Sequence, residues 1–338
     1  MTTQAMFYEA ISDNALRCTL CAHRCRIFED RRGICGVREN RGGTLVSLVY
    51  GRTVAEHVDF VEKKPLFHFL PGSRAYSIGT VGCNFHCSFC QNSDISQYPH
   101  NNHGEIAGYD RNPEQIVAAA KQARCQSIAY TYTEPSIFYE FALDTAILAR
   151  KEGIKNIFVS NGYMSPEAAD YASQYLDAVN IDLKAFTDDF YKKYCGGKLE
   201  PVLETIRLMK ELGVWMEITT LIIPGLNDGN NELKEIARFI KGVGSEIPWH
   251  IIQFYPAYKM RDWPETQLST LRRARDIGIN EGLMYVYEGN VPGEGREQTK
   301  CHNCGALLIE RFGAQLLKNR LQDGLCPDCG AAIDGVWL

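Results

Sequence analysis

The chain has 338 residues, 45% of them hydrophobic and 23% charged, as is typical of a soluble globular protein with one large domain and room for small attachments. Its net charge of -5 gives no general attraction to nucleic acid or to anionic membranes. The first residues carry no apolar signal region and no apolar run reaches the ~18 residues of a membrane span, so we expect a cytoplasmic protein with reduced thiols.

The first predicted module covers residues 1–72. It holds four of the 13 cysteines and, after them, a predicted hairpin over residues 42–52. Closed coordination by four thiolates suits zinc and an auxiliary iron–sulfur cluster, and of the two the pattern slightly favours zinc. The four cysteines, in a C-x2-C-x3-C-x9-C pattern, are Cys18, Cys21, Cys25 and Cys35.

Residues 73–290 alternate short β-branched runs with longer amphipathic stretches, a pattern that indicates a parallel sheet built from βα units. Six or seven such units predict an α/β fold with a partial (β/α)6-type TIM barrel, whose chemistry lies at the carboxyl ends of the strands. Polar residues do follow the predicted strands: Thr80, Thr133-Glu134, Ser160-Asn161, Asp182 with Lys184, and Tyr287, Glu288 and Asn290.

The loop after the first core strand reads GCNFHCSFCQN and places Cys83, Cys87 and Cys90 in a C-x3-C-x2-C pattern. Three thiolates on one short loop can hold three irons of a 4Fe–4S cube and leave the fourth iron open. That iron could chelate the amino and carboxylate groups of S-adenosylmethionine (SAM). A zinc knuckle is the alternative, but the position of the loop at the start of the βα series favours the cluster.

Residues 291–338 form a third predicted module with two C-x2-C pairs, each followed by glycine. Two such pairs separated by ~20 residues are typical of a structural zinc ribbon, with a rubredoxin-type iron site as the alternative. The cysteines are Cys301, Cys304, Cys326 and Cys329.

Three further features of the sequence are Cys195, segment 62–73 and His250. Cys195 follows the strand of Asp182 on the expected active-site side, where a thiol could donate a hydrogen atom or anchor an intermediate, or could simply be a buried free cysteine. Segment 62–73 would form a lip for a partner or substrate, or cover the bottom of the barrel. His250, inside a strand, is predicted to be a hydrogen-bonded core histidine.

The chain resembles the radical SAM superfamily, its glycyl-radical-enzyme activating branch and, more narrowly, the radical SAM enzyme of the AmmeMemoRadiSam system. The resemblance rests on CTLCAHRC, EKKPLFHFLPGS, GCNFHCSFCQN, YTYTEPS, SNGY, NIDLKAF, TTLIIPGLND, PWHIIQFYPAYK, VYEGNVPG and the final cysteine pairs. It implies reductive cleavage of SAM to a 5′-deoxyadenosyl radical that abstracts hydrogen from a protein or peptide. Alternative substrates are a small molecule or RNA, and the negative net charge disfavours RNA. A further alternative is that the protein is a non-catalytic scaffold. Implied partners are a reductant such as flavodoxin or ferredoxin, and Memo-type and AMMECR-type proteins.

The resemblance also assigns SAM-binding roles. Glu134 matches the acidic residue of a Gly-Gly-Glu-type motif, although Tyr132 and Thr133 replace its glycines, and would accept hydrogen bonds from the SAM ammonium group. Its alternative role is that of an acid at a helix N-terminus. Lys184 would pair with the SAM carboxylate or be an ordinary surface lysine. Val159 stands where activating enzymes often carry an acid. The predicted SAM-binding set is Phe89, Thr133, Glu134, Ser160, Asn161, Asp182 and Lys184.

Overall fold

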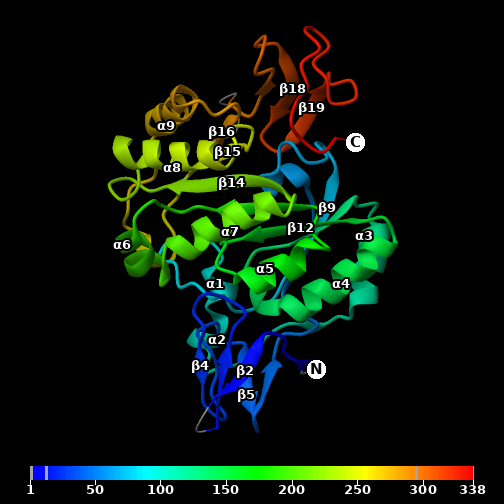
Figure 1. Ribbon diagram of the computed structural model, residues 1–338, viewed down its shortest axis with the longest axis vertical. Coiled ribbons are helices and arrows are strands. Elements are labelled where there is room, and N and C mark those ends of the chain that lie inside the picture. The colour runs from blue at the N-terminus through cyan, green and yellow to red at the C-terminus, as the bar shows by residue number, and fades with distance from the viewer. Residues whose placement is uncertain (1–2, 12–13, 292, 294–295, 338) are drawn as a thin grey trace.

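The computed structural model describes residues 3–11, 14–291, 293 and 296–337. Three parts follow one another along the long axis: a β-rich amino-terminal part at one end, a large α/β part in the middle, and a β-rich carboxyl-terminal part at the other end (Figure 1). In the described chain, no helix has the length and apolar character to cross a membrane.

The central part is built on an eight-stranded sheet in the order β16-β15-β14-β13-β12-β11-β9-β8. All neighbours are parallel except β8 with β9. This order leaves β8 and β16 as the two edges of the described sheet, so the barrel is open between them, and the predicted partial TIM barrel is confirmed. The strands are β8 (Ala55–Phe60), β9 (Arg74–Gly79), β11 (Ser127–Tyr130), β12 (Lys155–Ser160), β13 (Ala178–Asp182), β14 (Trp215–Ile222), β15 (Trp249–Gln253) and β16 (Val286–Gly289).

Helices alternate with the strands and cover the outside of the sheet (Figure 1). The sequence marks where they begin: α3 opens with a capping box between Asn112 and Gln115, and α5 with a Ser165 cap followed by Pro166. The main helices are α3 (Pro113–Gln122), α4 (Tyr139–Lys151), α5 (Pro166–Ser173), α7 (Glu200–Glu211), α8 (Asn230–Val243) and α9 (Leu268–Glu281). Shorter turns are η1 (Val61–Lys63), α1 (Ser93–Ser96), α2 (Tyr98–Asn101), η2 (Pro135–Phe138), α6 (Asp188–Phe190), η3 (Tyr191–Cys195) and η4 (Tyr258–Met260).

Two small sheets form the amino-terminal part, in the orders β1-β6-β5 and β2-β3-β4. The predicted hairpin lies nearer the amino terminus than expected, because Gly42 and Gly43 form its turn, with φ of 57° and 81°. The strands are β1 (Thr3–Gln4), β2 (Tyr8–Ile11), β3 (Ala15–Cys18), β4 (Arg26–Ile27), β5 (Arg38–Arg41) and β6 (Thr44–Ser47), and β7 (Arg52–Thr53) pairs with β10 (Tyr109–Asp110).

The carboxyl-terminal part consists of the two cysteine pairs and a sheet of β17 (Thr299–Lys300), β18 (Leu307–Phe312) and β19 (Gln315–Asn319). It packs on segment 62–73, where Leu70 and Val336 share a backbone hydrogen bond of 2.7 Å. Leu66 and Phe69 of the same segment join a core cluster with Ala75 and Ala178, near the amino ends of their strands. Segment 62–73 therefore covers the bottom of the barrel, the second of its two predicted roles.

Candidate active site

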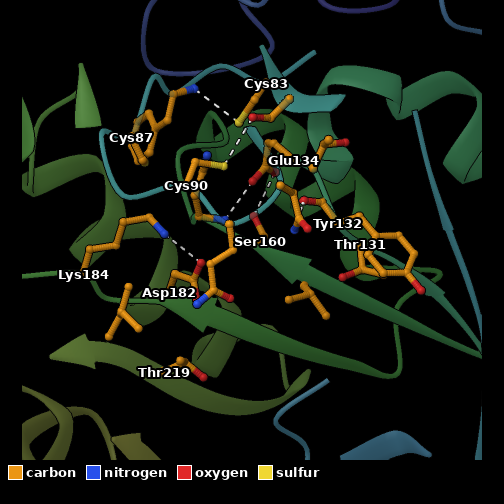
Figure 2. Close-up of a pocket in the computed structure, with 18 of the residues that line it drawn as sticks. Cys83, Cys87, Cys90, Thr131, Tyr132, Glu134, Ser160, Asp182, Lys184 and Thr219 are labelled. Carbon is orange, nitrogen blue, oxygen red and sulfur yellow. Dashed lines mark hydrogen bonds and ion pairs between the residues drawn. The ribbon is translucent and has the colours of Figure 1, made fainter. Parts of the chain in front are cut away.

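A cavity of about 370 Å³ opens at the carboxyl edge of the sheet, the edge where a barrel of this kind carries its chemistry. Cys83, Cys87 and Cys90 line it from the loop after β9, and Figure 2 labels them in the same part of the pocket as Glu134. The ends of β12 and β13 supply Ser160 and the Asp182 pair, and Lys63 to Pro65 reach the cavity from the barrel bottom.

The cysteine loop is held in shape by its own backbone and by the turn η3. The amides of His86 and Ser88 donate to the carbonyl oxygens of Cys195 and Tyr194, each at 2.8 Å. The amide of Phe85 lies 3.4 Å from the Cys83 sulfur and donates to it. A loop held by backbone bonds keeps its thiols pointed inward.

The three thiols fit an iron–sulfur cube. Among the described residues they do not come within 4.8 Å of one another as ligands of a single ion would, which suits a cube that separates its thiolates. Burial, and then the Glu134 carboxylate, raises the pKa of Cys83 well above its usual range, and burial raises that of Cys90. Buried thiols that are unfavourable as free thiolates gain their charge balance from a bound metal.

Glu134 is buried and caps η2, so its alternative role as an acid at a helix N-terminus is confirmed. Its carboxylate accepts from the Ser136 amide at 3.1 Å, the Ser160 hydroxyl at 2.9 Å and the Asn161 amide at 2.7 Å. A carboxylate has about four acceptor sites, so a fourth donor can still be bound from the cavity. Burial raises its pKa.

Tyr132, at the first glycine position of the motif, takes a φ of 67° that favours glycine. Asn92 fixes this backbone by donating to the Tyr132 carbonyl at 2.8 Å, and the ring packs under the Lys64 ammonium at 4.9 Å. The conformation that the motif needs is thus kept without its glycine. Thr133 lines the same cavity, with its hydroxyl donating to the Thr80 carbonyl at 3.0 Å.

Lys184 points into the cavity with its ammonium 2.8 Å from the Asp182 carboxylate and 5.9 Å from the centre of the Phe89 ring. Burial alone lowers the pKa of Lys184, but Asp182 and the neighbouring thiols outweigh burial and raise that pKa well above its usual range. The side chain is only 13% exposed, so it is a buried cation and the surface role considered for it is wrong.

Cys195 is fully buried, and its thiol interacts with the thiol of Cys87. This interaction, against the effect of burial and with help from Lys184, lowers the pKa of Cys87. The cavity lining does not include Cys195, so it lies behind the cysteine loop and acts on the cavity through Cys87. His250 is a buried core histidine, 2.6 Å from the Glu217 carboxylate, as predicted.

The carboxyl-terminal thiols form the tightest ligand set of the described residues, with all four sulfurs within 4.8 Å of one another. Cys301 and Cys329 lie 3.7 Å apart, as do Cys304 and Cys326. Tetrahedral zinc with Zn–S bonds of ~2.3 Å separates its sulfurs by about 3.8 Å, so the site fits one zinc ion.

Sequence reasoning missed Asn84, directly after Cys83. Its side-chain oxygen accepts from the Asn161 amide group at 2.7 Å, and its backbone oxygen meets the His23 ring at 2.7 Å. Asn84 therefore ties the cysteine loop to β12 and to the amino-terminal part. Its position beside a ligand cysteine was the one available signal.

Comparison with known proteins adds the family. The radical SAM superfamily matches residues 77–240. An uncharacterised protein of Methanocaldococcus jannaschii, MJ0808, is 46% identical over 98% of both chains, and the pyruvate formate-lyase-activating enzyme of Clostridium pasteurianum is 22% identical over 54% of this chain and 80% of its own. The crystal structure of Streptococcus suis SuiB bound to S-adenosylmethionine shares the fold, with a TM-score of 0.51 and 13% identity over 68% of this chain and 53% of that one.

Proposed function

Because this chain belongs to the radical SAM superfamily, whose members are enzymes, we propose that it cleaves SAM reductively at a 4Fe–4S cluster on Cys83, Cys87 and Cys90 and abstracts hydrogen from a protein or peptide. The observation that carries this proposal is the meeting of the three thiols, Glu134 and Lys184 in one cavity. When bound, the cluster supplies the electron that breaks a carbon–sulfur bond of SAM and so yields the 5′-deoxyadenosyl radical.

The chain's own residues bind and orient SAM. Glu134, already fixed by three donors, accepts from the SAM ammonium group with its remaining lone pair. Lys184 turns from Asp182 toward the SAM carboxylate, which keeps a buried cation paired throughout. Phe89, Thr133, Ser160 and Asn161 complete the SAM pocket, because all four line the cavity beside these two charges.

A protein or peptide substrate is favoured over a small molecule or RNA by the similarity to an activating enzyme. The motif resemblance supports the proposal that the chain acts in the AmmeMemoRadiSam system, with Memo-type and AMMECR-type proteins as partners. The reductant is a flavodoxin or ferredoxin, and the setting is the cytoplasm. The carboxyl-terminal thiols hold a structural zinc.

The test is anaerobic reconstitution followed by SAM and dithionite, with 5′-deoxyadenosine quantified. Wild type should form deoxyadenosine, a Cys83/Cys87/Cys90→Ala triple variant should form none, and a Cys125→Ala control should match wild type because that thiol lies outside the cavity. Deuterium transfer from labelled partner proteins into deoxyadenosine then identifies the substrate. Wild type with its full cluster and no deoxyadenosine, with or without the partners, sinks the proposal.

A further inference from the structure

The four cysteines of the amino-terminal part lie beside the loop of Cys83. The His23 ring, within that set, meets the backbone oxygen of Asn84 at 2.7 Å. On the other side, Gly82 packs so closely that a Cβ built on it would lie 2.9 Å from the carbonyl oxygen of Cys35. The four-cysteine site therefore touches both neighbours of Cys83.

The four thiols gather around one volume. Each of them interacts electrostatically with the other three, and all four are free thiols. The Cys18 amide donates to the Cys25 carbonyl at 2.9 Å, which closes the knuckle that brings the first three together. Cys35 comes from the loop between β4 and β5 and is buried.

The spacing of these sulfurs differs from that of the zinc-like pairs. The carboxyl-terminal thiols lie within 4.8 Å of one another, whereas the amino-terminal four do not form such a group in the described chain. The three thiols of the Cys83 loop do not form such a group in the described chain either. A single zinc ion draws its four sulfurs to about 3.8 Å, while a cube of iron and sulfide holds thiolates farther apart.

A second observation, the unpaired donors of the buried Arg38, points to a bound iron–sulfur cluster. Arg38 is 2% exposed, and its Nε and Nη1 have no hydrogen-bond partner. Its Nη2 donates to the Met6 carbonyl at 2.6 Å and to the Glu140 carboxylate at 2.8 Å. The guanidinium interacts electrostatically with Cys18 and Cys35 as well as with Glu140, so it lies close to the thiols. Buried guanidinium donors without partners are rare, and sulfur atoms of a cluster would satisfy them.

We infer that Cys18, Cys21, Cys25 and Cys35 hold an auxiliary iron–sulfur cluster, and that Arg38 donates hydrogen bonds to its sulfur atoms. The inference does not depend on SAM cleavage. It adds a second redox centre to the chain, in contact with the loop of the first.

The test isolates the second site in the full chain with Cys83→Ser, Cys87→Ser and Cys90→Ser, purified without oxygen from iron-replete cells. About four iron and four sulfide per chain should remain, together with an electron paramagnetic resonance signal after reduction. Adding Cys18→Ser and Cys35→Ser should remove the iron, and the matched control Cys125→Ser should leave it. The carboxyl-terminal site accounts for one zinc per chain in every variant. A folded triple variant that carries a second zinc and no iron, or that carries no iron and no sulfide, overturns the inference, and this holds even where the Cys18/Cys35 variant does not fold.

The Arg38 contact has its own readout in the same triple variant. Arg38→Lys keeps the positive charge beside Glu140 but loses the planar set of N–H donors, so the midpoint potential of the cluster should fall. Arg41→Lys, on the same strand and exposed, should leave the potential unchanged. An unchanged potential in Arg38→Lys rules out the donor role. Deoxyadenosine formation by wild type is measured separately, so failure here and failure of the proposed function are distinguishable.

Discussion

At the residue scale, the proposed function makes Glu134 the acceptor for the SAM ammonium group. Its remaining acceptor site faces a charged donor in the proposed complex, and such charge-assisted bonds contribute about 1.5–3 kcal/mol. Glu134→Gln should therefore weaken SAM binding roughly 10- to 100-fold, measured by equilibrium titration of the reconstituted protein. Glu114→Gln, on the exposed side of α3, is the control. An unchanged Kd in a folded, cluster-loaded Glu134→Gln protein would contradict the assignment.

Cys195 offers a second test at this scale. The Cys195 thiol interacts with that of Cys87, and if it donates to the sulfur of the cluster ligand, Cys195→Ala should remove about 1 kcal/mol of stabilisation of the reduced cluster and lower the potential by roughly 40 mV for one electron. Cys195→Ser keeps a donor and should retain most of the potential. Potentiometric titration followed by electron paramagnetic resonance measures both. A hydrogen-atom donor, the role first considered for Cys195, would instead leave the potential intact and stop turnover of the substrate.

Single residues also mark the limit of sequence reasoning. Glu134, Ser160 and Lys184 could be found because each ends a recognisable strand. Asn84 could not, since its hydrogen bonds join segments 77 and 61 residues apart in the chain. Tyr132 keeps a glycine conformation through contacts with Asn92 and Lys64, which no local pattern reveals.

At the scale of elements, segment 62–73 forms the floor of the barrel through a buried histidine. His68 meets the Asp334 carbonyl at 2.7 Å and the Tyr287 hydroxyl at 2.6 Å, and its amide donates to Glu217 at 2.8 Å. Burial lowers the pKa of His68 to about 4, so the ring is neutral in the folded protein at neutral pH. The segment is polar and aromatic in sequence, which is why both a lip and a floor were consistent with it.

This depressed pKa predicts acid lability. The unfolded ring has a pKa of about 6.5, so between about 6.5 and 4 the unfolded chain binds more protons and stability falls as the pH falls. The slope from His68 is at most about 1.4 kcal/mol per pH unit. Denaturant unfolding at several pH values should show this loss, and His68→Gln should flatten it. Equal slopes in both proteins would contradict the contribution of His68.

At the scale of the whole molecule, the order of strands and helices could be predicted because buried strand runs alternate with helical stretches, two of which, α3 and α5, also begin with a side-chain cap. The docking of the outer parts could not. Arg311 bonds the Phe67 carbonyl at 2.7 Å across 244 positions of the chain, and Arg38 pairs with Glu140 across 102. Contacts at such separations leave no periodic signal, so the sequence predicts three parts but not that the outer two hold the floor and the cysteine loop.

Removal of the carboxyl-terminal metal tests this dependence. Arg311 and Val336 both hold the backbone of the floor, so loss of the fold around the two cysteine pairs should loosen segment 62–73 and the barrel with it. We expect Cys326→Ser with Cys329→Ser to release one zinc per chain and to lower the melting temperature of the entire protein, not of a separate transition. Cys125→Ser, buried but outside every ligand set, should change neither zinc content nor the number of transitions. Zinc loss with an unchanged melting temperature of the barrel would mean that the floor is held by segment 62–73 alone.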